Sequence, residues 1–200
     1  MFRGQRTLAG FLLVVSVGAA GIALLGPYIA KAHETLPVYG RVPAFSLVDQ
    51  DGKALSRDTL QGRVWIADFI FTRCAGQCPM MSAQMARLSA ALPRRGAVRL
   101  VSFTVDPTWD TPPVLAQYAK TYGASPAVWS FVTGDTAQLR RLCREGFRLA
   151  VAEGAGTVEE PITHSVRLVL VDRAGDIRGY YDAADAGALK RLQRDLRKLL

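Results

Sequence analysis

Two cysteines separated by three residues, Cys74 and Cys78, have the clearest capacity for chemistry in this sequence. They lie between an apolar run, Val64 to Phe71, that predicts a buried strand, and a segment from Pro79 to Leu92 whose apolar spacing predicts a helix. The N-terminus of a helix favours a thiolate over a thiol, and we expect this effect at Cys78 and Cys74. Thiolates are both nucleophiles and soft metal ligands, so the pair can hold one metal ion or close into a disulfide.

His164 is a candidate third ligand. It precedes a predicted strand, Val166 to Val171, and follows a loop, Glu153 to Pro161, whose glycines would allow it to move toward the cysteines. Two thiolates and an imidazole form a soft ligand set that suits Cu(I) and can hold Cu(II). A structural zinc site ordinarily needs a fourth protein ligand, and the sequence offers none at a standard spacing.

Asp106 follows a second predicted strand, Val98 to Val105. The carboxyl end of a parallel strand is the edge where α/β sheets place their sites, so Asp106 is a candidate accessory residue. An Asx turn before Pro107 is the alternative role for this side chain. Asp110 is interpreted differently, because Asp110 or Thr111 followed by proline is typical of a helix N-cap, which favours a cap over a catalytic role for Asp110.

The remaining sulfur atoms have structural explanations. Met81 and Met85 are one helical turn apart, which favours packing, although a methionine such as Met80 could add a soft copper ligand. Cys143 shares a helical face with Leu139, which indicates a buried small hydrophobic residue.

Strands and helices alternate along the chain after the N-terminal segment. A hairpin around residues 49–53 precedes the central strand, a further strand is predicted from Phe147 to Val151, and a last hairpin strand, Ile177 to Tyr181, leads into a final helix. This alternation predicts an α/β fold with a central mixed sheet flanked by helices. A cysteine pair at the start of the first long helix indicates a thioredoxin-like domain.

The N-terminal segment is apolar. No charged residue occurs from Leu8 to Ala30, and Arg3 and Arg6 precede this run, which predicts a transmembrane helix with its N-terminus in the cytoplasm. A cleaved signal peptide is the alternative, because residues 30–32 fit a cleavage site. In both cases the domain reaches an oxidising compartment. The expected parts are a cytoplasmic arm (residues 1–7), a transmembrane anchor (8–30), a linker (31–41) and a thioredoxin-like domain (42–200).

The net charge of +8 is densest in the last predicted helix, where cations alternate with leucines. This pattern is typical of an amphipathic surface helix, whose charged face is either solvated or a docking patch for an acidic partner or lipid headgroups. Nucleic acid is not an expected partner outside the cytoplasm. The cations are Lys190, Arg191, Arg194, Arg197 and Lys198.

Three separated stretches resemble motifs of the Sco/SenC family, and they occur in the family's order from about Val42 to the C-terminus. They are DFIFTRCAGQCP at residues 68–79, VDPTWDTP at residues 105–112, and Thr163-His164-Ser165 ahead of residues 170–172 and 179–181. The resemblance implies a membrane-tethered, thioredoxin-like copper protein that assists assembly of the binuclear copper centre of cytochrome c oxidase. It also implies that Cys74, Cys78 and His164 bind copper, and that Asp106 lies near the site and takes part in partner function.

Two functions are compatible with these residues. A copper metallochaperone would pass its ion by ligand exchange to an acceptor, either the copper-bearing subunit of the oxidase or another extracytoplasmic cuproprotein. A thiol-disulfide reductase would instead reduce the acceptor cysteines, which needs two sulfurs but no histidine. A peroxidase fits less well, because the Pro-x-x-x-Thr-x-x-Cys pattern of peroxiredoxins is absent. We expect a monomer in a bacterial inner membrane, anchored in the bilayer by a single pass, with its domain facing the periplasm.

Overall fold

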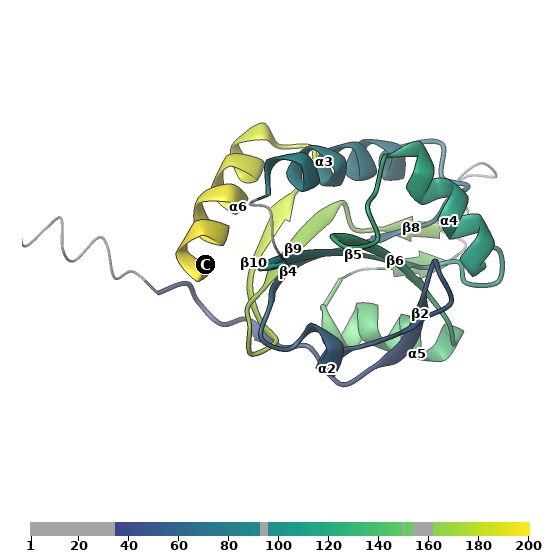
Figure 1. Cartoon of the computed structure of the whole chain (residues 1–200), viewed down its shortest axis with the longest axis horizontal. Helices are drawn as coiled ribbons and strands as arrows, with labels where there is room; N and C mark the ends of the chain where they lie inside the picture. The colour runs from purple at the N-terminus through teal and green to yellow at the C-terminus, as the bar shows by residue number, and fades with distance from the viewer. Residues whose placement is uncertain (1–34, 93–95, 150, 154–161) are drawn as a thin grey trace, which may run out of the picture. The chain divides into compact units, whose positions relative to one another are not determined.

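The computed structural model describes residues 35–92, 96–149, 151–153 and 162–200 (Figure 1). The side chains of residues 151–153 and 162–164 are not described. The predicted cytoplasmic arm, the predicted transmembrane anchor and residues 31–34 of the predicted linker lie outside the described residues. Within the described residues, no helix combines the length and the apolar character needed to cross a membrane.

The unit from Leu36 to Leu200 is built on a mixed sheet of eight strands, counted over the described residues. The strands β4, β5 and β6 run parallel, and every other pair of neighbours in the sheet is antiparallel. The predicted central mixed sheet is therefore confirmed. In spatial order the strands are β1 (Gly40–Arg41), β10 (Asp176–Asp182), β9 (Arg167–Val171), β4 (Val64–Ile70), β5 (Val98–Thr104), β6 (Trp129–Thr133), β2 (Ser46–Asp49) and β3 (Ala54–Ser56).

Helices cover both faces of this sheet (Figure 1). One face is covered by α3 (Gln77–Ala91), α4 (Pro112–Thr121) and α6 (Ala186–Leu199), which share a hydrophobic cluster with it. The other face is covered by α2 (Arg57–Leu60) and α5 (Thr136–Arg141), and α5 continues as a π-helical turn, Leu142–Gly146. The sheet is therefore a central layer between two apolar clusters, as expected for a sheet with parallel strands.

β4 carries the cysteine turn at its carboxyl end, and both clusters hold the strand in place. All seven of its residues are buried. Because side chains alternate along a strand, Ile66 and Ile70 lie in the cluster under α3, α4 and α6, whereas Trp65 and Phe69 lie in the other cluster. The Phe69 ring stacks on that of Phe103 in β5, with centroids 5.2 Å apart. The cysteine turn thus begins from a rigid strand.

A second, two-stranded antiparallel sheet pairs β7 (Val151–Glu153) with β8 (Ile162–His164). The predicted strand from Phe147 to Val151 is wrong, because β7 begins only at Val151. Phe147 is instead buried, and its ring packs edge-on against those of Trp65 and Phe69. Residues 154–161, which make up nearly all of the predicted loop, lie outside the described residues.

Candidate functional site

Cys74 lies in the turn after β4, and Cys78 is the second residue of α3. Gly76 is the N-cap of α3 and offers no side chain to its backbone N–H groups. The Cys74 sulfur takes this role, because the backbone N–H of Cys78 donates a hydrogen bond to Cys74 Sγ at 3.4 Å. The turn therefore brings the two cysteines together, and no disulfide joins them in this structure.

The two thiols differ in exposure. Cys74 is 7% exposed, whereas Cys78 is fully buried. Burial raises the pKa of the Cys78 thiol far above its ordinary value, because a thiolate would lose its hydration there. The prediction that the helix N-terminus favours a thiolate at Cys78 is therefore wrong for this structure, in which desolvation outweighs the helix dipole. A metal ion or a disulfide at this sulfur must displace a proton.

Asp106 lies beside the cysteine turn, as the sequence predicts. Its carboxylate Oδ2 accepts a hydrogen bond of 2.5 Å from Nη2 of Arg73, the residue before Cys74. The Arg73 guanidinium also lies over the Trp109 ring, 4.6 Å from its centroid, and Trp109 is 52% exposed. Asp106, Arg73 and Trp109 thus form a polar and aromatic surface next to Cys74.

Asp110 has a role that the sequence pattern did not reveal. The N-cap of α4 is Thr111, and Asp110 is instead completely buried. Its carboxylate accepts hydrogen bonds from the backbone N–H of Thr72 at 3.1 Å, from Thr72 Oγ1 at 2.5 Å and from Thr104 Oγ1 at 2.5 Å. It therefore ties the cysteine turn to the end of β5. Thr111, one of the two predicted candidates, is thus the cap; the interpretation of Asp110 as a cap is wrong, because its carboxylate finds its partners across the sheet edge rather than in its own helix.

His164 ends β8, and its backbone pairs with Val151. It precedes β9, which runs antiparallel to β4 with Ala67 opposite Val169. Because of this direction, β9 begins at the end of the sheet where β4 leads into the cysteines. The backbone of His164 therefore approaches the same end of the sheet as Cys74, while its side chain is not among those described.

The other sulfur-containing residues fit their predicted structural roles. Met81, Met85 and Cys143 are buried in apolar clusters, and burial raises the pKa of the Cys143 thiol to about 12. Met80 is partly buried and packs against the same cluster as Met81. Among the side chains that the structure describes, no group of three or more His, Cys, Asp or Glu residues is arranged to hold a metal. A ligand set with three such residues would need His164 or another residue beyond that part.

A central strand, a turn with two cysteines and a long helix, set in a mixed sheet with helices on both faces, define a thioredoxin-like dithiol protein. The sequence profile of SCO1/SenC matches residues 36–200. The chain belongs to the SCO1/SenC family.

Two relatives are similar over most of their length. The chain is 34% identical over 151 residues to a SCO1 protein homolog of Bacillus subtilis, covering 74% of this chain and 77% of the relative. It is 35% identical over 150 residues to a protein of Stutzerimonas stutzeri named as a candidate copper-binding protein, covering 74% and 72% of the two chains.

Two solved structures share the fold. The first is BsSco, a member of the Sco family of cytochrome c oxidase assembly proteins, in which a disulfide switch was identified. This match has a TM-score of 0.72 and 29% sequence identity, and it covers 83% of this chain and 98% of the BsSco chain. The second is ScoI of Bradyrhizobium japonicum with copper bound, which matches with a TM-score of 0.68 and 23% identity over 80% of this chain and 99% of that one.

Proposed function

We propose that this chain binds one copper ion and delivers it to the binuclear copper centre of cytochrome c oxidase. The observation that carries the proposal is the pair of sulfurs in one turn, where the N–H of Cys78 reaches the sulfur of Cys74 at 3.4 Å. Thiolate sulfur is the ligand type that Cu(I) prefers. Family membership, the copper-bound ScoI and the oxidase-assembly role of BsSco's family support the same conclusion.

The proposed ligands are Cys74, Cys78 and His164. The two sulfurs come from a turn held by β4 and α3, and the backbone of His164 approaches the same end of the sheet. Copper would displace the proton of the buried Cys78 thiol, so binding releases protons and weakens as the pH falls. Copper transfer to an acceptor dithiol would then be a ligand exchange between two similar pairs of sulfur ligands.

We propose in addition that residues 8–30 anchor the chain in the inner membrane and that the domain faces the periplasm. The apolar run without charges and the two arginines before it support this arrangement. An anchored copper carrier would meet acceptors in the same membrane without diffusing through the compartment. The domain would be present there as a monomer.

Anaerobic Cu(I) titration of the reduced full chain tests the proposal. We expect one copper per chain and at least a hundredfold loss of affinity in each of Cys74→Ser, Cys78→Ser and His164→Ala. Cys143→Ser is the matched control, because Cys143 is buried on the other face of the sheet and should leave binding unchanged. Unchanged affinity in His164→Ala would remove His164 from the ligand set, and unchanged affinity in both cysteine variants would overturn the proposal.

Reduction of an acceptor disulfide is a second candidate function, because the two thiols differ in accessibility. Cys74, the more exposed thiol, would attack the acceptor disulfide, and Cys78 would resolve the mixed disulfide. The chain's two thiols become a disulfide, and the acceptor's disulfide becomes two thiols. We expect the His164→Ala variant to reduce a disulfide-containing acceptor peptide at the wild-type rate, because the histidine takes no part in this exchange.

A further inference from the structure

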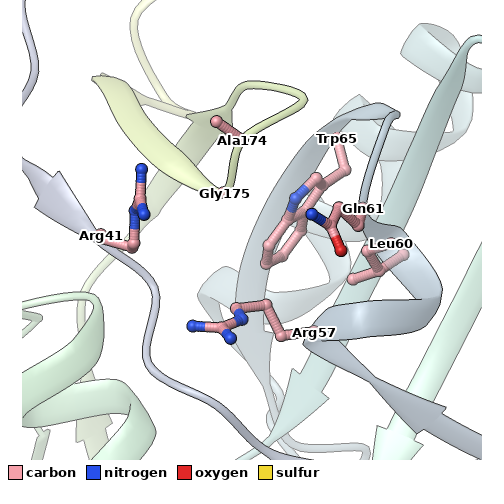
Figure 2. A pocket seen from close by; sticks show the side chains of 7 residues that line it. All are labelled: Arg41, Arg57, Leu60, Gln61, Trp65, Ala174 and Gly175. Carbon is pink, nitrogen blue, oxygen red and sulfur yellow. The ribbon is translucent and has the colours of Figure 1, made fainter.

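A cavity of about 100 Å³ opens at the end of β4 that lies opposite the cysteine turn (Figure 2). Trp65, near the start of β4, forms part of its wall, whereas Cys74 follows the other end of this strand. The cavity is therefore separate from the proposed copper site. The lining residues are Arg41, Arg57, Leu60, Gln61, Trp65, Ala174 and Gly175.

The wall of the cavity is rich in donors. Arg41 from β1 and Arg57 from α2 extend toward the hollow beneath the Ala174-Gly175 turn, and the Gln61 amide and the Trp65 ring lie across from them (Figure 2). None of these lining residues carries a carboxylate. Two guanidinium groups among lining residues that include no acidic side chain favour an anionic ligand, although each guanidinium also has a neighbouring carboxylate, Asp176 for Arg41 and Asp58 for Arg57.

Arg57 has donors to spare. Its Nη1 donates to the carbonyl oxygen of Val42 at 3.4 Å, and its Nη2 lies 3.6 Å from Oδ1 of Asp58. The Asp58 side chain is 78% exposed, so this ion pair is screened by water and weak. A guanidinium has five N–H groups, and these two contacts leave most of them for a ligand.

Arg41 is held in place by a different contact. Its Nε and Nη2 donate to the two carboxylate oxygens of Asp176 at 2.7 Å and 3.2 Å, which fixes the plane of the guanidinium and leaves Nη1 for another acceptor. The neighbouring turn lies close to Arg57, because a Cβ on Gly175 would lie 3.8 Å from Arg57 Cδ, an ordinary van der Waals contact. The two arginines are thus positioned before any ligand arrives.

We propose that this cavity binds a phosphate group through Arg41 and Arg57. Two guanidinium groups and the Gln61 amide present donors from several directions, which suits a tetrahedral oxyanion with three or four acceptor oxygens better than a planar carboxylate. The volume exceeds the roughly 10–15 Å³ that a single water needs, so a small ion fits. The phosphate comes either from solution or from a phospholipid headgroup.

The surface next to Arg41 bears on the choice between these sources. Val38 and Tyr39 precede Arg41 on the same segment and are 59% and 46% exposed. Exposed aromatic and aliphatic side chains beside arginines are typical of a surface that rests on lipid headgroups. The lipid source is therefore tested alongside free phosphate.

Calorimetric titration of the full chain with inorganic phosphate, in a neutral detergent at constant ionic strength, tests the proposal. We expect saturable binding that is at least tenfold weaker in Arg57→Gln and unchanged in Arg63→Gln. Arg63→Gln removes the same charge from an exposed arginine outside the cavity. Copper binding should be unchanged in both variants, so failure here is distinct from failure of the proposed function. Absence of saturable binding, or equal affinity in Arg57→Gln, would overturn the site.

A measurement on the unmodified chain guards against a variant that fails to fold. Phosphate should slow hydrogen exchange in residues 57–65 and 173–176 and leave α4 unaffected. Equal exchange with and without phosphate would also overturn the site.

Repeating the phosphate titration in nanodiscs distinguishes free phosphate from a phospholipid headgroup as the occupant. Weaker phosphate binding with phosphatidylglycerol than with phosphatidylcholine alone supports the proposal with a lipid headgroup as occupant, and equal binding supports it with free phosphate.

Discussion

Thr72 Oγ1 donates a hydrogen bond of 2.5 Å to the buried carboxylate of Asp110, which follows it by 38 residues. Thr72 begins the turn that carries Cys74, and Asp110 lies in the segment between β5 and α4. The backbone N–H of Thr72 bonds to the same carboxylate. The position of the cysteine turn therefore depends on a side chain from a different part of the sheet edge.

Replacing Asp110 by alanine should destabilise the domain and loosen the cysteine turn. The change leaves the buried hydroxyl of Thr104 and the half-buried donors of Thr72 without their acceptor, which costs about 3 kcal/mol of unfolding free energy. Asp110→Asn keeps one acceptor oxygen and should cost less. Urea unfolding measures the free energy, and hydrogen exchange at Thr72 measures the turn.

Asp135→Ala is the control for this experiment. Asp135 caps α5 by accepting from the backbone N–H of Gln138 at 2.7 Å, so its loss should cost about 1 kcal/mol and leave exchange at Thr72 unchanged. An Asp110→Ala variant as stable as the Asp135→Ala variant, with normal exchange at Thr72, would show that the carboxylate does not hold the turn.

The ion pair between Arg73 and Asp106 should contribute little to stability. The Arg73 side chain is 50% exposed and that of Asp106 12% exposed, so water screens their attraction. We expect a coupling free energy of about 0.5–1 kcal/mol between the two side chains. A double-mutant cycle with Arg73→Ala and Asp106→Ala, followed by urea unfolding, measures it. A coupling well above this range would mean that the pair is effectively desolvated.

The sequence predicts the central elements well because their signals are local. The apolar run of β4, broken only by Asp68, reflects a strand covered on both faces, and α3 begins within two residues of the predicted start. The position of Asp106 follows from the rule that sites lie at the carboxyl ends of parallel strands. These predictions need no knowledge of distant contacts.

The predictions that failed depend on tertiary structure. Asp110 before Thr111 and two prolines has the pattern of a cap, and only the neighbouring strand ends reveal that Thr72 and Thr104 are its partners. The run from Phe147 resembles a strand, but Arg148 has a φ of 53°, which interrupts an extended backbone. The buried Cys78 shows the same limit, because desolvation cannot be read from local sequence.

Cys143 should be unreactive toward alkylating reagents in the folded protein. It is 1% exposed, and burial raises the pKa of its thiol to about 12, so the nucleophilic thiolate is scarce at pH 8. Mass spectrometry after iodoacetamide treatment should detect modification at Cys143 only once the chain is unfolded in guanidinium. Rapid modification of the folded chain at Cys143 would indicate that the π-helical turn opens locally.

Asp68 should make the domain less stable as the pH rises from about 4 to about 7. This residue of β4 is completely buried, and neither carboxylate oxygen has a hydrogen-bond partner among the described residues. Burial raises its pKa from 3.8 to about 7, because the ionised carboxylate would lose its hydration there. The folded state therefore holds a proton that the unfolded state releases near pH 4, and above pH 7 folding must bury a charge.

The resulting penalty is on the order of 4 kcal/mol above pH 7 and vanishes below pH 4, where Asp68 is protonated in both states. Asp68→Asn removes the charge with little change of shape. The variant should be more stable than the wild type at pH 8 by a few kcal/mol and similar to it at pH 4. Urea unfolding of both reduced, metal-free chains at several pH values measures the difference. A difference that does not change with pH would show that the carboxyl does not titrate between the folded and unfolded states.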